Sequence, residues 1–301
     1  ADRSGVHLAR RAVTRLSQRP DGQWITLDDI RTVAAAGLLH DIGHYPFSHA
    51  IEELGRPVLP HEEVGRILIE DGSLGDALVK LGLDPGRVAS LIHDEREMLP
   101  PRDRVLHQIL SGTLDVDKLD YLPRDARACH VPYGGVDTDR LLGSLDVATI
   151  DHPDLASSDP RVVVTPKGIS SLHSLINARQ EMFDNVYWHH TNRACMVMLL
   201  RAVQDALVGD CLAPEDLWRL DDTSLLATLQ GDRMPATTRR LATALVERDI
   251  HKRALEIGNR AIELYGRLGN LWFDPAARRA VEIQMAEALS RRLGRGVGEA
   301  A

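Results

Sequence analysis

The chain has 301 residues, of which 44% are hydrophobic and 27% are charged, and its formal net charge is −8 at pH 7. These values are typical of a globular protein with a substantial core, and the acidic balance argues against nucleic acid as a partner. No apolar run approaches the roughly 20 residues that span a bilayer, and no cationic leader opens the chain, so we expect a cytoplasmic protein without a membrane partner. The widely spaced cysteines favour free thiols in a reducing compartment: Cys129, Cys195 and Cys211.

Helical periodicity dominates the first half of the chain. Apolar residues recur at helical spacing in residues 6–16, and a Thr-x-x-Asp start signal opens residues 26–40. Further amphipathic segments follow in residues 60–72, 84–95 and 103–112. Because the chain begins inside the first of these helices, we expect residues upstream of Ala1.

The stretch between residues 145 and 168 is the exception, because two short β-rich runs separated by Asp, Pro and Ser predict a small hairpin. One long helix is expected over residues 168–207, and further helices over residues 237–249, 251–269 and 275–293. A Pro- and Asp-rich segment near residue 210 marks the best candidate boundary. The sequence therefore predicts a mostly α protein, with a helical core in residues 1–210 and a C-terminal helical region in residues 211–301 packed on it.

Polar side chains that bind metals gather at the end of the helix predicted for residues 26–40. His40, Asp41, His44 and His49 lie close together in the sequence, and imidazole and carboxylate groups are ligands for divalent cations near neutral pH. Adjacent side chains on a helix diverge by about 100°, so His40 and Asp41 converge on one ion only where the helix ends. We expect Gly43 to supply the backbone freedom for that turn.

A second acidic segment supplies the remaining carboxylate. Residues 112–126 predict a helix on which four aspartates crowd together: Asp115, Asp117, Asp120 and Asp125. The residue pattern alone leaves open which of them faces the metal.

Four motifs taken together resemble the HD-domain phosphohydrolases, in particular the deoxynucleoside triphosphate triphosphohydrolase branch: HDIGHYPFSH, PHEEVG, LDVDKLDYLPRDA and ARQEMFDNVYWHH. The resemblance runs in order from about residue 5 to residue 195. It implies an HD-domain helical core that binds one divalent ion (manganese, magnesium, iron, nickel or zinc), with a second magnesium ion accompanying the nucleotide. It places metal ligands at His40, Asp41 and Asp117, and leaves Asp115 and Asp120 as alternatives to the last.

The first ligand histidine of this family has no clear counterpart here. By its spacing from Leu8 and Ala9, this ligand lies upstream of Ala1, is replaced at Ala1, or is shifted to His7. Loss of the ligand would weaken metal binding and activity.

The resemblance also implies roles for other side chains. It places His49 and His61 at the catalytic histidine positions, with Glu52 orienting a histidine and His44 lining the pocket near the phosphates. Contacts to the sugar and phosphates fall on one group of residues: Lys118, Tyr121, Asp125, Arg179 and Tyr187.

The implied function is metal-dependent hydrolysis of deoxynucleoside triphosphates to deoxynucleoside and triphosphate, by a cytoplasmic homo-oligomer (a dimer or tetramer). Two alternatives stay open. The chain acts on another nucleotide, such as a nucleoside monophosphate or a guanosine alarmone, or it is a non-catalytic nucleotide sensor.

Overall fold

The computed structural model describes residues 3–93, 95–149, 160–258, 260–272 and 274–294. The helices of the N-terminal half are α1 Arg3–Ser17, α2 Leu27–Leu39, α3 His49–Glu52, α4 His61–Glu70, α5 Ser73–Lys80, α6 Pro85–His93, α7 Pro101–Leu110, α8 Val116–Ala128 and α9 Thr138–Gly143. Those of the C-terminal half are α10 Ile169–Met182, α11 His190–Val208, α12 Pro214–Leu217, α13 Asp222–Leu229, α14 Ala236–Glu247, α15 Ile262–Trp272 and α16 Pro275–Leu293. Short 3₁₀ turns lie at Pro20–Gly22, Arg96–Met98, Pro132–Gly134 and Pro166–Gly168. The predicted mostly helical HD fold is confirmed.

The start of α2 shows how the sequence sets a helix boundary. The Thr26 hydroxyl accepts a hydrogen bond from the backbone N–H of Asp29 at 3.2 Å, and the Asp29 carboxylate accepts one from the Thr26 N–H at 2.8 Å. This reciprocal pair is a capping box, which satisfies two donors that the first turn of a helix leaves free. The predicted start signal is therefore confirmed.

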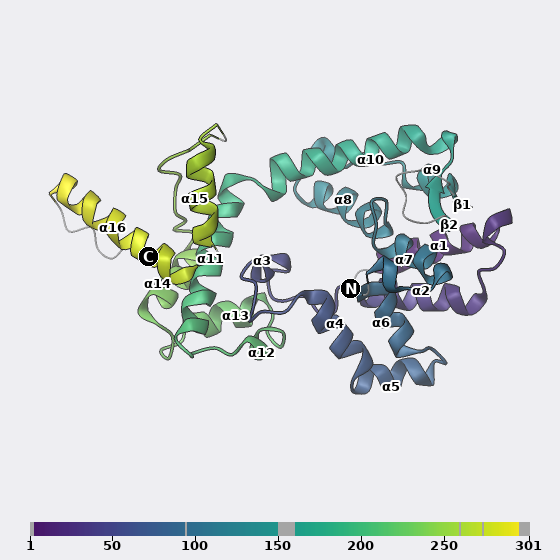
Figure 1. The fold of residues 1–301 in the computed structure, drawn as a ribbon, viewed down its shortest axis with the longest axis horizontal. Helices are drawn as coiled ribbons and strands as arrows, with labels where there is room; N and C mark the ends of the chain where they lie inside the picture. Colours follow the sequence, from purple (N-terminus) through teal and green to yellow (C-terminus); the bar gives the residue numbers. More distant parts are fainter. Residues whose placement is uncertain (1–2, 94, 150–159, 259, 273, 295–301) are drawn as a thin grey trace.

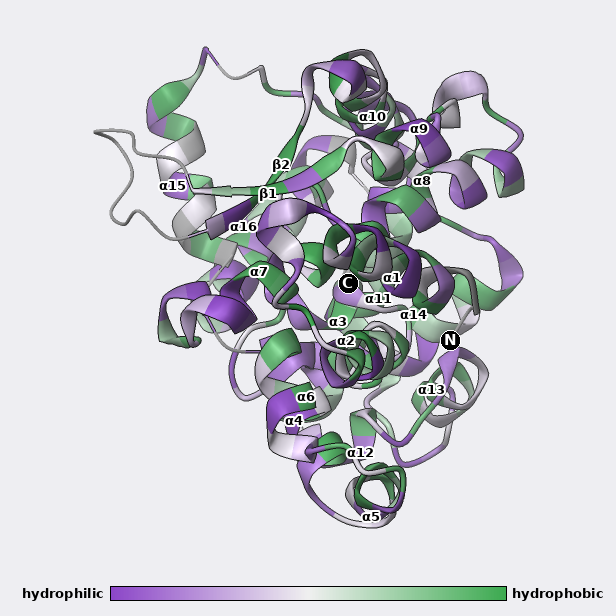
Figure 2. Cartoon of the chain, turned by 90° about the vertical axis from the view of Figure 1, so that its right-hand side faces the viewer, coloured by the Kyte–Doolittle hydropathy of each residue, from purple (hydrophilic) through white to green (hydrophobic). Residues whose placement is uncertain are grey.

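Buried apolar side chains form two clusters. The first joins α1, α2, α6, α7 and α8 to the hairpin, with Leu16 and Leu106 fully buried. The second joins the segment around Tyr45 and Ile51 to α11, α13 and α14. Figure 1 shows the two groups of helices on either side of α3, with α10 running along the top of the first group toward α11. In Figure 2, hydrophobic and hydrophilic residues alternate along the helices, as amphipathic packing requires.

The hairpin is confirmed. Its strands β1 (Leu145–Thr149) and β2 (Pro160–Val164) pair antiparallel, with Leu145 opposite Val164. The residues that connect them, 150–159, lie outside the described residues.

The single long helix predicted over residues 168–207 is wrong. The chain instead forms α10, a π-helical turn at Phe183–Tyr187, and then α11. His189 has extended backbone angles and its Nδ1 accepts the N–H of Thr191 at 3.3 Å, so it starts the new helix. Aromatic and β-branched residues are weak helix formers, which makes this stretch easy to break.

The helix predicted over residues 251–269 begins only at Ile262. The preceding helix α14 ends at Glu247, because the next residue, Arg248, has a left-handed φ of 60° and the N–H of Asp249 bonds to the carbonyl of Ala244 at 2.8 Å. Residues 251–256 are exposed, so no apolar surface supports their helical pattern.

The boundary predicted near residue 210 stays a prediction. In the described residues, buried side chains of α11 already belong to the second cluster, beside those of α13 and α14. No helix in the described part of the chain is long and apolar enough to cross a membrane.

Candidate active site

The end of α2 brings His40 and Asp41 to the surface of the first cluster. After α2 the chain turns, and the N–H of His44 bonds to the carbonyl of Asp41 at 3.1 Å. Gly43 was expected to supply backbone freedom, but its φ is not among the positive values. A side chain there would instead meet the carbonyl oxygen of His61 at 2.0 Å. The glycine therefore permits close approach to α4, which brings His61 to the site.

Three side chains form a group that fits a divalent metal ion. The Nε2 atom of His40 lies 3.2 Å from Oδ1 of Asp41 and 3.4 Å from Oδ1 of Asp117. The Nδ1 atom of His40 lies 3.1 Å from the carbonyl oxygen of Gly37, so Nδ1–H is the donor and Nε2 presents its lone pair to the carboxylates. This Nε2 is buried and has no hydrogen-bond partner. Such a nitrogen between two carboxylates fits a cation better than it fits an apolar core.

The ionisation of this group is set by burial and charge. Burial lowers the pKa of His40, but the nearby carboxylates of Asp117 and Asp41 outweigh it and raise the pKa. Burial likewise raises the pKa of Asp41, but the hydrogen bond from His44 and the neighbouring histidines lower it overall. The carboxylate of Asp41 is thus available as an anionic ligand.

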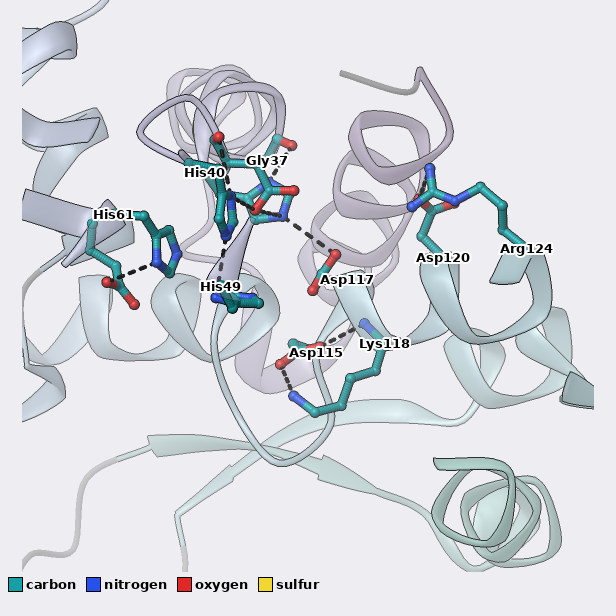
Figure 3. Close-up of polar contacts among 12 residues, drawn as sticks. Gly37, His40, His49, His61, Asp115, Asp117, Lys118, Asp120 and Arg124 are labelled. Carbon is teal, nitrogen blue, oxygen red and sulfur yellow. Dashed lines mark hydrogen bonds and ion pairs between the residues drawn. The ribbon is translucent and has the colours of Figure 1, made fainter. Parts of the chain in front are cut away.

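Figure 3 separates the three candidate aspartates of α8 by their partners. The Asp115 carboxylate caps α8 through the N–H of Lys118 at 2.9 Å and forms an ion pair with the Lys118 ammonium group. Asp120 pairs with Arg124 at 3.4 Å. Asp117 alone of the three appears in the group around His40. The geometry favours Asp117 as the ligand over both alternatives.

A second group of ligand-type side chains lies beside the first: His44, His49, Glu52 and His61. The rings of His44 and His61 stack, with centroids 4.0 Å apart. His44 connects the two groups, because its Nδ1 lies 3.3 Å from Oδ1 of Asp41 and its Nε2 lies 3.4 Å from Nδ1 of His49. The metal group of His40, Asp41 and Asp117 therefore adjoins the group of candidate proton-transfer residues.

Glu52 anchors the histidines of the second group. Its Oε1 lies 2.9 Å from Nδ1 of His61 and 3.7 Å from Nδ1 of His49. Burial raises the pKa of Glu52, but the hydrogen bonds from His49 and His61 outweigh it and lower the pKa to about 2. The hydrogen bond to Glu52 raises the pKa of His49 against the opposing effect of burial. The His49 side chain is 72% exposed, so it is open to an incoming ligand, whereas that of His61 is 12% exposed.

Glu62 was not assigned a role from the sequence. Its Oε2 lies 3.2 Å from Nδ1 of His61, so His61 is held by two carboxylates. The signal was its position directly after His61 in the first turn of α4.

The predicted sugar and phosphate contacts also come together, at the junction of α8 and α10. The Tyr187 hydroxyl donates to Oδ2 of Asp125 at 2.8 Å, and the ring centroids of Tyr121 and Tyr187 are 6.3 Å apart. Burial and the Asp125 carboxylate raise the pKa of Tyr187, so its hydroxyl stays a donor. Arg179 interacts with the hydroxyl group of Tyr121 and lies over the Phe183 ring at 5.1 Å.

Lys118 is less free than its predicted role implies. Its ammonium group pairs with Asp115 and donates to the carbonyl of Gly112 at 2.9 Å. A phosphate group would have to compete with both.

His7 does not join the metal group among the described residues. It is exposed and lines a surface hollow on α1 together with Arg10, Arg11 and Gln18. Ala1, the other position considered for the first ligand, lies outside the described residues.

Comparison with known families gives two matches that together cover most of the chain. Residues 7–125 match the family model described as the HD domain, and residues 136–291 match the one described as the HD associated region. The first match contains the metal and histidine groups, and the second begins after α8.

Individual relatives divide into proteins with and without a named activity. An uncharacterized protein of Methanocaldococcus jannaschii is 32% identical over 202 residues, which are 67% of this chain and 40% of the relative. An uncharacterized protein of Bacillus subtilis is 30% identical over 174 residues, 57% of this chain and 36% of the relative. The deoxynucleoside triphosphate triphosphohydrolase SAMHD1 homolog of Dictyostelium discoideum is 28% identical over 272 residues, 83% of this chain and 49% of the relative. The chain thus spans half or less of the length of these relatives.

Proposed function

The chain belongs to the HD-domain family, and we propose that it hydrolyses deoxynucleoside triphosphates to deoxynucleoside and triphosphate in a metal-dependent reaction. The observation that carries this proposal is the contact between the two groups. His44 lies within 3.4 Å of both Asp41 and His49, so the predicted metal ligands adjoin the predicted proton-transfer residues. The named activity of the Dictyostelium relative supports the choice of substrate.

The metal site is proposed to consist of His40, Asp41 and Asp117. A divalent ion held by these residues would supply positive charge to the phosphates and would lower the pKa of a bound water. The identity of the ion and the number of ions bound stay predictions, and so does assembly into a homo-oligomer.

The histidine group is proposed to move protons. Oε2 of Glu52 accepts a hydrogen bond from Nδ1–H of His61, which fixes the tautomer and leaves Nε2 free for the substrate. Water attacks the α-phosphorus, the bond to the 5′ oxygen breaks, and that oxygen takes a proton from His49 or His61 as the deoxynucleoside leaves. The raised pKa of His49 favours the protonated form that a general acid requires.

The tyrosine pair is proposed to read the sugar. Tyr187 and Asp125 form a fixed polar pair, and Tyr121 packs beside them. A tyrosine ring against the 2′ carbon leaves no room for a hydroxyl group, which would favour deoxynucleotides.

Product analysis tests the function. We expect the protein, incubated with a panel of nucleotides and Mn²⁺ or Mg²⁺, to release triphosphate from deoxynucleoside triphosphates. Release of orthophosphate from a nucleoside monophosphate, or pyrophosphate from a guanosine alarmone, would identify another HD phosphohydrolase instead. Binding without any product would favour the nucleotide sensor. An Asp117→Asn variant controls for contaminating phosphatases.

Replacing Arg179 by alanine should raise KM roughly tenfold while changing kcat little, because a charged hydrogen bond to phosphate acts in the ground state as well. The defect should grow with ionic strength as the remaining charges are screened. Steady-state kinetics at two salt concentrations measure the rise in KM and its dependence on ionic strength. The control is Lys80→Ala, which removes an exposed lysine at the end of α5. An unchanged KM would remove Arg179 from the substrate site.

A further inference from the structure

The segment directly before His49 has an unusual backbone. Phe47 and Ser48 both have positive φ values, 61° and 52°, although neither is glycine. Ser48 also has a ψ of −127°, which lies outside the regions that L-residues favour. Residues in such conformations persist only where their surroundings hold them. Because Ser48 is the residue before His49, the backbone here sets the direction from which the His49 side chain enters the site.

Hydrogen bonds within the segment hold only part of this turn. The N–H of Ser48 donates to the carbonyl of Tyr45 at 2.9 Å, and the N–H of Ala50 donates to the carbonyl of Phe47 at 3.2 Å. Tyr45 itself is buried, and its hydroxyl donates to the carbonyl of Leu59 at 3.0 Å. These bonds fix the two ends of the turn, and the backbone N–H of Phe47 at its apex needs a separate acceptor.

That acceptor comes from a distant part of the chain. The N–H of Phe47 donates to Oδ1 of Asp222 at 2.8 Å. Asp222 is the first residue of α13, whose start is fixed by a capping box between Asp221 and Ser224. The carboxylate therefore extends from a well-anchored helix of the HD associated region to the catalytic segment of the HD domain.

Apolar packing does not replace this hydrogen bond. Phe47 and Ser48 border a hollow of about 490 Å³, which Cys195 of α11 and Leu226 of α13 also line. The Phe47 side chain is at the edge of exposure, at 36%. A turn over a hollow has little van der Waals contact to resist movement, so the polar contact to Asp222 carries more of the constraint.

We propose that Asp222 is a positioning residue, which holds the Phe47–Ser48 turn and thereby directs His49 into the active site. The C-terminal helices thus take part in catalysis by completing the HD domain, without touching the substrate. This inference rests on the proposed function, because it assigns Asp222 a role in the reaction of His49.

Three variants separate positioning from stability. Asp222→Ala removes the acceptor and should lower kcat roughly three- to tenfold with little change in KM, the range expected for one hydrogen bond. Asp222→Asn keeps an oxygen acceptor of the same shape and should restore kcat. Asp221→Ala breaks the cap of the same helix but leaves the Asp222 carboxylate in place, so it should lower Tm and reduce kcat less than Asp222→Ala does. Equal loss of kcat in Asp222→Asn and Asp222→Ala, or a larger loss in Asp221→Ala, would overturn the proposal.

A second readout does not depend on activity. Cys195 shares the hollow with the turn, whereas Cys129 is exposed on the far end of α8. Alkylation followed by mass spectrometry should show Cys195 reacting roughly three- to tenfold faster in Asp222→Ala, with Cys129 unchanged. If the unsubstituted protein hydrolyses no deoxynucleotide, the proposed function fails but this labelling still tests the hold on the turn. Equal alkylation rates of Cys195 in Asp222→Ala and in the unsubstituted protein would refute the proposal that Asp222 holds the turn.

Discussion

Replacing Asp117 by asparagine should remove the bound divalent ion and the hydrolytic activity while leaving the helices folded. The Asp117 carboxylate lies 3.4 Å from Nε2 of His40, and asparagine has the same shape without the charge. Changing a residue that only orients a metal ligand typically costs about 10- to 100-fold in metal affinity, so loss of a ligand should cost at least as much. Metal analysis of the purified protein measures the loss, and circular dichroism confirms the fold.

Asp120→Asn is the matched control for this experiment. It lies on the same helix and makes the same change of charge, but its carboxylate pairs with Arg124. We expect it to keep the metal. If metal content survives both Asp41→Ala and Asp117→Asn, the ligand assignment is wrong, and Asp115 and Asp120 become the candidates again.

Local signals explain why the first half of the fold was predictable. Thr26 and Asp29 are spaced for a capping box, and the structure forms it. Apolar residues on one face of residues 6–16 become the buried side of α1, including Val13 and Leu16. Each of these features depends on residues within a few turns of one another, which a sequence pattern records directly.

The errors occurred where a local pattern lacked long-range support. The pattern at residues 251–269 is helical, but residues 251–258 form no helix and residues 251–256 are exposed. The break at His189 depends on a backbone hydrogen bond to its ring, which no periodicity reveals. Gly43 was correctly singled out, but for the wrong reason, because only the structure shows that α4 passes directly against it.

In the candidate site, too, local features could be predicted from the sequence and long-range contacts could not. The identities of the ligand-type residues were apparent from their concentration in the sequence. Their partners were not, because the ion pair between Lys118 and Asp115 and the contact of Asp222 with Phe47 depend on side-chain directions or on residues far apart. Resemblance to a family supplied the roles of Arg179 and Tyr187, which spacing alone would not have assigned.

The other large effect is expected at the histidine group. Replacing His61 by alanine should lower kcat by about 10² to 10⁴, the usual contribution of a general acid or base, and should weaken substrate binding far less. His49→Ala should behave in the same way. Single-turnover kinetics with one deoxynucleotide, together with binding measured in the absence of turnover, separate the two effects. A loss below about tenfold would place either histidine in the pocket lining.

The Glu52→Gln variant links this loss to pH. The carboxylate raises the pKa of His49 above its ordinary 6.5, so His49 stays protonated to higher pH. If His49 is the general acid, activity falls as pH rises through this pKa, and Glu52→Gln should move that limb of the kcat profile to lower pH.

The pKa values of Glu52 and His49 also predict the pH range in which their contact stabilises the fold. The pKa of Glu52 is lowered from 4.5 to about 2. The stability that its ionised form gives the folded protein is therefore complete above pH 4.5 and is lost as the pH falls toward 2. The pKa of His49 is raised above 6.5, so the stability that its protonated form gives is complete below pH 6.5 and is lost as the pH rises through the raised pKa.

Glu52→Gln should therefore lower Tm most between pH 4.5 and 6.5. The control is Glu53→Gln, which removes a neighbouring carboxylate that pairs with Arg193. If Glu52→Gln changes neither the pH dependence of kcat nor that of Tm, Glu52 does not set the pKa of His49. The proposed proton transfer by His49 and His61 would then lack the carboxylate on which it depends.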